Sequence, residues 1–195
     1  MKKIVLTAFE PFGSIESNVT IAILNKIKQE NSKVKTYILP VVFAEVKPRM
    51  IEIIEKEEPD VLIMLGQAAG ALKIRIEKTA LNYVNATIVD NKNNQPLDQK
   101  INNDENTAYF TTIDDVKLYQ QLDHNYVERS YSAGTYVCNY LYFETLSYIN
   151  KTNKKIDAIF IHYPLSTEQA EAQFKHLPLS ILVEQTKKII NYLMM

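Results

Sequence analysis

Residues 60–66 read Asp-Val-Leu-Ile-Met-Leu-Gly, and this stretch decides the fold class. A largely apolar run that ends at a glycine is typical of a β-strand buried on both of its faces. Strands of that kind belong to parallel sheets, because the crossover helices of a parallel sheet cover both faces. The stretch therefore predicts an α/β protein.

The sequence on either side alternates between strand-like and helix-like segments. Residues 18–29 carry apolar side chains at helical spacing, and residues 47–57 fit a helix with Pro48 in its first turn. Residues 74–76 and 81–89 suggest two extended segments, and residues 90–105 a long surface loop. The other predicted strands span residues 3–8, 34–39, 126–131 and 156–161, and the other predicted helices span residues 114–122, 135–150 and 180–193. This order predicts one domain over residues 1–195, with a central mixed sheet and helices on both of its faces.

The composition excludes several classes of protein. With 46% hydrophobic and 23% charged residues, the 195-residue chain has the composition of an ordinary globular protein. Its 22 basic and 23 acidic residues give no electrostatic footprint for a nucleic acid or an anionic membrane. No stretch approaches the roughly 20 apolar residues of a transmembrane helix, and Glu10 and Pro11 end the first apolar run too early for a signal peptide. With a single cysteine that has no intramolecular partner, these observations predict a cytoplasmic protein.

That only cysteine, Cys138, lies where a turn is predicted to lead into a helix. It belongs to the segment Ser-Ala-Gly-Thr-Tyr-Val-Cys-Asn-Tyr at residues 132–140. The unpaired N–H groups and the dipole of a helix N-terminus favour an anion, and therefore a reactive thiolate. The alternative is that Cys138 packs in the core as a small hydrophobic residue.

A nearby imidazole would activate such a thiol. His124 follows a predicted helix and His176 lies in a predicted loop, whereas His162 stands at the end of the apolar run 158–161. Active-site residues of open α/β sheets collect just past the ends of buried strands. His162 is therefore the candidate partner of Cys138, although it fits an ordinary loop or capping histidine equally well.

A third group is needed to orient the imidazole. Glu77 is flanked by alternating apolar residues and may face the interior, but a surface glutamate paired with Arg75 or Lys78 is the alternative. The segment Gly-Gln-Ala-Ala-Gly at 66–70 could direct backbone N–H groups at an oxyanion, or could simply end a strand. No metal-ligand spacing, P-loop or dinucleotide fingerprint is present, so we expect neither metal nor organic cofactor.

Several segments together resemble pyroglutamyl peptidase I, or pyrrolidone-carboxylate peptidase, a family of cysteine peptidases. They follow the family's order over nearly the whole chain, and the segment around the cysteine is the most specific of them. The matching segments are Phe-Glu-Pro-Phe-Gly (9–13), Leu-Pro-Val-Val-Phe (39–43), Gly-Gln-Ala-Ala-Gly (66–70), Glu77 with Ala80 and Asn82, Asp90-Asn91, Thr-Ala-Tyr-Phe (107–110), residues 132–140, and Phe-Ile-His-Tyr-Pro (160–164).

The resemblance implies a three-layer α/β/α fold of the phosphorylase/hydrolase-like type, with a largely parallel mixed sheet. It implies a triad of Glu77, Cys138 and His162 that removes N-terminal pyroglutamyl residues from peptides, without metal or organic cofactor. The family is commonly homotetrameric, so self-association is the expected partner relation. The substrate pocket implied by position is apolar, with two polar contacts to the lactam ring. Its apolar residues are Phe9, Phe12, Tyr136 and Val137, and its polar residues are Asn18 and Gln67.

The chain also departs from the family's pattern. Ala71 stands where the family usually has an arginine associated with the oxyanion site; Lys73 or Arg75 could replace it. Ser14 stands where a glycine is common, Val19 replaces a proline, and the segment 167–179 is shorter than usual. Two alternatives follow: a weak or inactive homologue that binds blocked peptide N-termini without efficient turnover, and a hydrolase for a different small acyl or lactam group.

Overall fold

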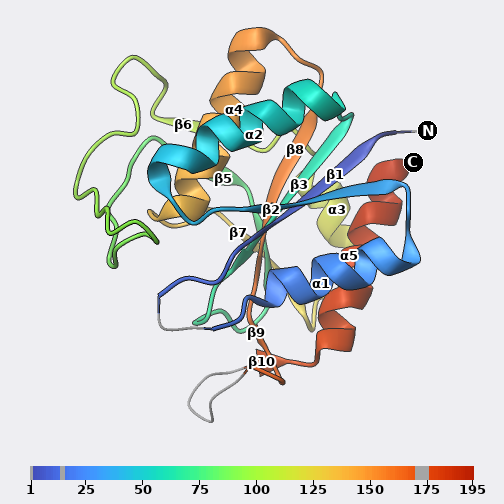
Figure 1. Cartoon of the computed structure of the whole chain (residues 1–195). Coiled ribbons are helices and arrows are strands. Elements are labelled where there is room, and N and C mark those ends of the chain that lie inside the picture. Colours follow the sequence, from blue (N-terminus) through green and yellow to red (C-terminus); the bar gives the residue numbers. More distant parts are fainter. Residues whose placement is uncertain (1, 14–15, 170–175) are drawn as a thin grey trace.

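A six-stranded mixed sheet forms the centre of the molecule (Figure 1). The computed structural model describes residues 2–13, 16–169 and 176–195. The strand order is β2-β1-β3-β8-β4-β7; the first four strands run parallel to one another, β4 runs antiparallel to β8, and β7 runs parallel to β4. The bounds of these strands are Ile4–Phe9 (β1), Val34–Leu39 (β2), Val61–Gln67 (β3), Ile74–Glu77 (β4), Val127–Ser130 (β7) and Asp157–Tyr163 (β8). The predicted mixed, largely parallel sheet is confirmed.

Helices cover both faces of this sheet. Figure 1 shows α2 and α4 together on one side, and α1, α3 and α5 on the other. Each side has its own apolar cluster, which joins the helices to alternate residues of the strands. The bounds of the helices are Val19–Glu30 (α1), Phe43–Glu57 (α2), Asp115–Gln120 (α3), Val137–Thr152 (α4) and Leu179–Met194 (α5). The three-layer α/β/α architecture is therefore present as predicted.

Strand β3 shows why its sequence is continuously apolar. Leu62 and Met64 belong to the cluster under α2 and α4, whereas Ile63 and Leu65 belong to the cluster under the other helices. All four side chains are fully buried. Successive side chains of a strand point to opposite faces, so a strand between two helical layers needs an apolar residue at every position.

Helix α2 begins at Phe43 rather than at Lys47, so Pro48 lies inside the helix. The prediction that Pro48 occupies the first turn is wrong. The helix starts earlier because the backbone N–H of Phe43 donates to Oδ2 of Asp90 at 3.0 Å. A carboxylate at this position satisfies a donor that the first turn leaves unpaired. Pro48 then costs the helix one internal hydrogen bond without ending it.

The prediction of an extended segment over residues 81–89 is also wrong. Strand β5 (Thr79–Leu81) ends at the start of this segment. It pairs with β6 (Ala108–Phe110) to make a separate two-stranded sheet. Beyond Leu81 the chain makes only an isolated bridge between Val84 and Gln99. The backbone N–H groups of Asn85 and Ala86 donate instead to the carbonyls of Thr135 and Pro96. Residues 90–105 form the predicted loop, whose path is set by such contacts rather than by a strand pattern.

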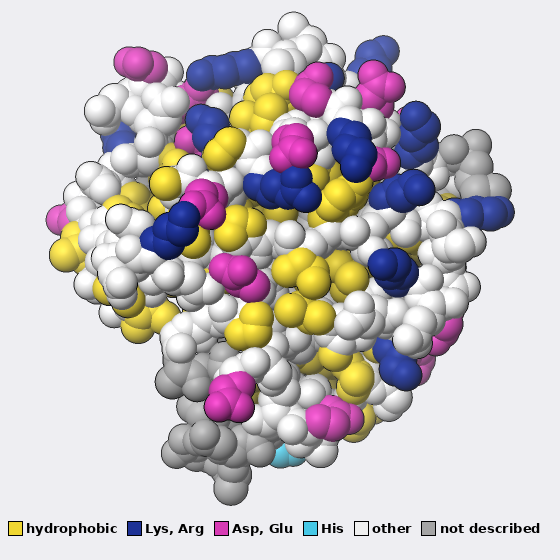
Figure 2. Space-filling view, in the orientation of Figure 1, with side chains coloured by type: hydrophobic (Ala, Val, Ile, Leu, Met, Phe, Trp, Pro, Cys, Tyr) yellow, Lys and Arg dark blue, Asp and Glu magenta, His cyan; other side chains and the backbone are white. Residues whose placement is uncertain are grey.

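The surface carries charges of both signs. On the face in Figure 2, basic and acidic side chains are interspersed, with apolar side chains between them. This agrees with the net charge of −1. Across the described ranges, none of the helices has the length and apolar character that a membrane crossing requires.

Candidate active site

The antiparallel pairing of β4 with β8 brings Glu77 and His162 together. Glu77 lies opposite Phe160, and Arg75 lies opposite His162. Glu77 and His162 are therefore diagonal neighbours on one face of the sheet, within reach of long side chains. Oε1 of Glu77 lies 2.8 Å from Nδ1 of His162, and the two side chains are 1% and 9% exposed. Glu77 is thus a buried partner of the imidazole and not a surface glutamate.

Cys138 reaches the same imidazole from α4. It is the second residue of that helix, and its partly buried side chain hydrogen-bonds His162. Glu77 occupies Nδ1 of His162, so the hydrogen bond with the Cys138 thiol is assigned to Nε2. Three elements distant in sequence thus join in one line of hydrogen bonds, from Glu77 through His162 to Cys138.

The two partners change the acidity of His162. Burial opposes the charged imidazole, but the hydrogen bonds that His162 makes with Cys138 and Glu77, and the electrostatic attraction to both, outweigh it. The pKa of His162 rises to about 9. The imidazole is therefore positively charged at neutral pH, as a thiolate–imidazolium pair requires.

Gly66 lets β3 pass directly against this imidazole. A Cβ atom on Gly66 would lie 2.7 Å from Cε1 of Phe160 and 2.9 Å from Cδ2 of His162. Contacts that short do not occur between real side chains, and the ring of Phe160 is held in the core. Any other residue at position 66 would push His162 away from the thiol.

The predicted apolar pocket residues all belong to the apolar cluster under α2 and α4 or pack against it. Phe9 and Val137 are buried in the cluster under α2 and α4, and Phe12, Tyr136 and Cys138 pack against that cluster. The ring centroids of Phe12 and Tyr136 are 5.9 Å apart. All four predicted residues therefore share one apolar cluster with Cys138.

The two predicted polar residues lie where the start of α1 meets the end of β3. Asn18 caps α1: its Oδ1 accepts from the N–H of Thr20 at 3.0 Å and from the hydroxyl of Thr20 at 2.7 Å, and its Nδ2 donates to the carbonyl of Glu10 at 3.3 Å. Gln67 follows Gly66 at the end of β3, and its Oε1 accepts from the N–H of Val19 at 2.8 Å. Much of Asn18 is thus committed to the helix, whereas Gln67 keeps its Nε2 group.

The start of the predicted surface loop 90–105 is tied by hydrogen bonds to α2 and to the segment after β1. Asp90 is buried, and it accepts from the N–H groups of Phe43, Lys92 and Asn94. Burial would raise the pKa of this carboxyl, but the hydrogen bonds from those N–H groups hold it below its usual value. Asn91 donates to Oε1 of Glu10. The match at Asp90-Asn91 was visible in the sequence, but its role follows only from these contacts.

Contacts of the Tyr136 side chain connect the start of α4 to α2 and to the segment before that loop. Phe43 meets Tyr136 edge-on at 5.6 Å between centroids, and the hydroxyl of Tyr136 donates to the carbonyl of Val89 at 2.9 Å. The side chain of Ile88 would contact a Cβ placed on Gly13, whose φ of +63° favours glycine. Phe43 and Val89 are therefore direct neighbours of Tyr136, one of the predicted pocket residues.

Lys73 and Arg75, the two cations considered as replacements for an arginine at position 71, make contacts away from Ala71. Ala71 is buried, and its N–H closes a turn with the carbonyl of Ala68 at 2.9 Å. Nζ of Lys73 donates to the carbonyl of His124 at 2.7 Å, and Nε of Arg75 donates to Glu128 at 2.9 Å. Both cationic side chains are thus engaged elsewhere.

The other two histidines stay apart from this arrangement. His124 stacks on Tyr119 with ring centroids 4.0 Å apart, and His176 lies in β10 (His176–Leu177), which pairs with β9 (Leu165–Ser166). In the part of the chain that the structure describes, no three His, Cys, Asp or Glu side chains are grouped to hold a metal ion.

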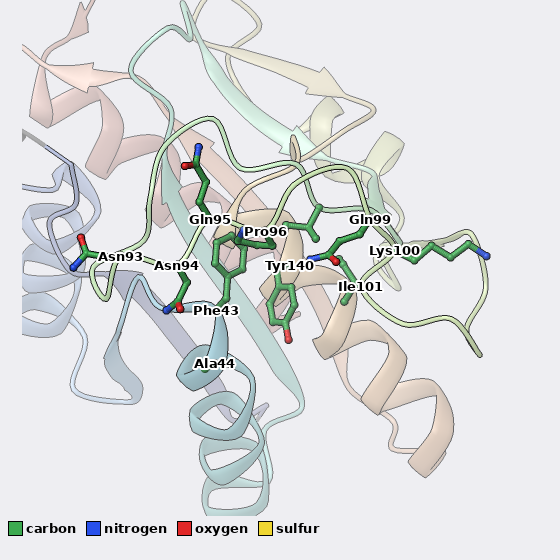
Figure 3. A pocket seen from close by; sticks show the side chains of 11 residues that line it. Phe43, Ala44, Asn93, Asn94, Gln95, Pro96, Gln99, Lys100, Ile101 and Tyr140 are labelled. Atoms are coloured by element: carbon green, nitrogen blue, oxygen red, sulfur yellow. The ribbon is translucent and has the colours of Figure 1, made fainter.

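A surface pocket of about 720 Å³ is lined in part by the aromatic residues Phe43 and Tyr140 (Figure 3). Phe43 and Tyr140, whose centroids are 5.4 Å apart, lie between the start of α2, α4 and the loop residues 93–101. Neither Cys138 nor His162 is among its lining residues. The pocket therefore adjoins the candidate active site without belonging to it.

Comparison with known proteins identifies the family. A model of the pyroglutamyl peptidase family matches residues 2–192. The chain belongs to this family. A pyrrolidone-carboxylate peptidase of Thermosipho melanesiensis is 39% identical over 172 residues, which are 86% of this chain and 85% of that protein. One from Bacillus subtilis is 32% identical over 173 residues, covering 86% and 80% of the two chains.

Solved structures of the pyroglutamyl peptidase family share the fold. Pyroglutamyl peptidase I of Bacillus amyloliquefaciens matches with a TM-score of 0.91 at 29% identity, over 97% of this chain and 95% of that one. Pyrrolidone carboxyl peptidase of Thermococcus litoralis matches with a TM-score of 0.90 at 30% identity, over 98% and 92% of the chains. These relatives are all named as peptidases, so the alternative of an inactive binding homologue is not supported. Of the departures noted in the sequence, Ser14 and residues 170–175 lie outside the described residues.

Proposed function

We propose that this protein is a cysteine-type omega peptidase that releases N-terminal pyroglutamyl residues, with Glu77, Cys138 and His162 as its catalytic triad. One observation carries the proposal: His162 bonds Glu77 and Cys138 at once, at the first turn of α4. A nucleophile, a base and a group that orients the base are the parts that acyl transfer needs.

In the first half of the reaction, the Cys138 thiolate attacks the carbonyl carbon that joins the pyroglutamyl residue to the rest of the peptide. The carbon–nitrogen bond breaks, and His162 gives its proton to the departing amine. The product is a thioester between the pyroglutamyl group and Cys138. The raised pKa of His162 suits this step, because the imidazolium is present to act as the acid.

In the second half, neutral His162 takes a proton from a water molecule, whose oxygen attacks the thioester. The carbon–sulfur bond breaks, pyroglutamate leaves, and the thiolate and imidazolium are restored. Glu77 holds the imidazole in one orientation and stabilises its positive charge in both halves.

Backbone N–H groups at the start of α4 are the support we propose for the oxyanion. Tyr136, the residue before the helix, makes no side-chain cap to the first turn among the described residues. The N–H groups beside Cys138 are therefore available to a developing negative charge. With Ala71 in place of an arginine, this support lacks a cationic side chain, and we expect slower turnover than in relatives that have one.

The residues of the predicted pocket are proposed to select the substrate. Phe9, Phe12, Tyr136 and Val137 supply apolar surface for the compact lactam ring, and Gln67 and Asn18 supply its polar edge. A buried site that hydrogen-bonds a substrate group rejects analogues that lack it, which accounts for narrow specificity. We propose peptides with N-terminal pyroglutamate as the substrates, and a cytoplasmic homotetramer as the form of the protein that cleaves them.

A fluorogenic pyroglutamyl coumarylamide tests the proposal. Wild-type protein is expected to release the fluorophore, whereas Cys138→Ser and iodoacetamide-treated protein release none. Release that persists in the serine variant would exclude Cys138 as the nucleophile. Binding of a pyroglutamyl peptide without any release would instead point to the inactive homologue.

A further inference from the structure

The side chain of Gln169 lies where three segments of the site's polar edge meet. Its Nε2 donates to the carbonyl oxygen of Ser17 at 3.0 Å, to the hydroxyl of Ser17 at 2.9 Å and to Oε1 of Gln67 at 3.2 Å. Ser17 precedes α1, Gln67 ends β3, and Gln169 follows β9 on the chain that continues from His162. One amide group thus links the three segments.

Backbone donors fix which way both amides point. The N–H of Val19 can only donate, so the atom of Gln67 that it meets at 2.8 Å is the oxygen. The N–H of Ser166 likewise meets Oε1 of Gln169 at 3.3 Å, which turns Nε2 of Gln169 toward Gln67 and Ser17. The orientation of the pair therefore follows from the backbone and not from a choice between amide rotamers.

This arrangement decides what Gln67 can offer a bound molecule. Its Oε1 accepts from Val19 and from Gln169, and a carbonyl oxygen has two lone pairs. Nε2 is left, and it can only donate. Gln67 is 6% exposed, so little water is present to compensate for a mismatched contact.

We propose that Gln169 is a positioning residue for substrate recognition: it holds Gln67 with its N–H donors toward the ring carbonyl of the pyroglutamyl lactam. The inference rests on the proposed function, because it concerns the same pocket. The ring carbonyl is the acceptor that distinguishes a pyroglutamyl from a prolyl ring. Without Gln169, only the N–H of Val19 holds the Gln67 oxygen. The amide then turns more easily to bring its oxygen toward the ring carbonyl, where two acceptors would face each other.

Gln169→Met tests the inference, because methionine keeps the length of the side chain and removes its donors. We expect KM for the pyroglutamyl coumarylamide to rise about tenfold, the value of one hydrogen bond, with kcat within about twofold of wild type. The lactam contact is made equally in the ground and transition states, so its loss appears in KM. The rate at which iodoacetamide alkylates Cys138 should not change, because the triad is untouched.

Gln185→Met is the matched control. Gln185 is a buried glutamine whose Oε1 accepts a backbone N–H, that of Asp123 at 3.2 Å, and it makes no contact with the triad. We expect this variant to lose stability with an unchanged KM. If it raises KM as much as Gln169→Met does, general loosening explains the effect and the inference is overturned.

A binding measurement separates this inference from the proposed function. In a Cys138→Ser background, Gln169→Met should weaken the affinity for a pyroglutamyl dipeptide amide by the same factor, as measured by calorimetry. Unchanged affinity and KM in a protein that cleaves pyroglutamyl substrates overturn the inference alone. A wild-type protein that neither cleaves nor binds them overturns both.

Discussion

At the scale of single residues, Glu77 and His162 are expected to set the pH range of the proposed activity. The charge of Glu77 helps to hold the pKa of His162 at about 9. A group whose pKa is raised keeps its proton until the pH reaches that value, so activity should fall on the alkaline side as His162 loses its proton near pH 9.

Glu77→Gln removes that charge and is therefore expected to move the alkaline limb of the kcat/KM profile to lower pH. The rate at neutral pH should also drop by roughly 10²–10⁴, because the orienting carboxylate is lost. Hydrolysis rates measured across the pH range check both effects. An alkaline limb that does not move would show that Glu77 does not tune His162.

Ala71 is the second residue with a defined consequence. Ala71→Arg is expected to raise kcat by roughly 10²-fold, the value of one oxyanion donor, if the guanidinium reaches the carbonyl oxygen. Ala71 is buried, so the thermal stability of the variant must be followed alongside its steady-state kinetics. A stable variant with unchanged kcat would show that the backbone donors alone support the oxyanion.

At the scale of elements, Tyr142 connects the helix that carries Cys138 to the strands that carry Glu77 and His162. Its hydroxyl donates to the carbonyl of Glu77 at 3.1 Å, one turn along α4 from Cys138. Its ring packs on Phe160, whose ring in turn contacts His162 at 4.8 Å between centroids. Tyr142 is fully buried, and that burial raises the pKa of its phenol.

Tyr142→Phe is therefore expected to lower kcat several-fold and to slow the alkylation of Cys138, with a stability loss of about 1 kcal/mol for the missing hydrogen bond. Tyr163→Phe is the control, because Tyr163 is equally buried and its hydroxyl lies 2.8 Å from Thr186 in α5, on the opposite face. Equal alkylation rates in the two variants would contradict a positioning role for Tyr142.

The elements also show what the sequence could predict. The strand at 61–67, the start of α4 near Cys138 and the strand end at His162 follow from local patterns, and so they were found. The start of α2 depends on Asp90, which is 47 residues from Phe43, and the contact between Gln169 and Gln67 spans 102 residues. Local patterns carry no signal for such contacts, so residues that act through them were missed.

The same reasoning applies to the triad. The positions of Cys138 and His162 suggested their chemistry but also fitted a packed cysteine and an ordinary loop histidine. Glu77 also fitted a surface ion pair, and the register of β4 against β8 shows it buried beside His162. The family resemblance supplied what local patterns could not.

At the scale of the whole molecule, the proposed homotetramer is open to direct measurement. Large apolar side chains that stay exposed in the single chain include Phe110 and Tyr131, each 64% exposed. Sedimentation velocity at micromolar protein concentration is expected to give the mass of four chains. A species with the mass of one chain would contradict the assembly and leave the triad unaffected.

The central claim is that Cys138 carries the pyroglutamyl group during the reaction. Wild-type protein mixed with a pyroglutamyl peptide and quenched in acid within the first turnovers should contain a fraction whose mass has increased by one pyroglutamyl group. Peptide mapping should place that group on Cys138, and the Cys138→Ser protein should carry none. Rapid release of pyroglutamate from a protein that never shows the acylated cysteine would contradict the account.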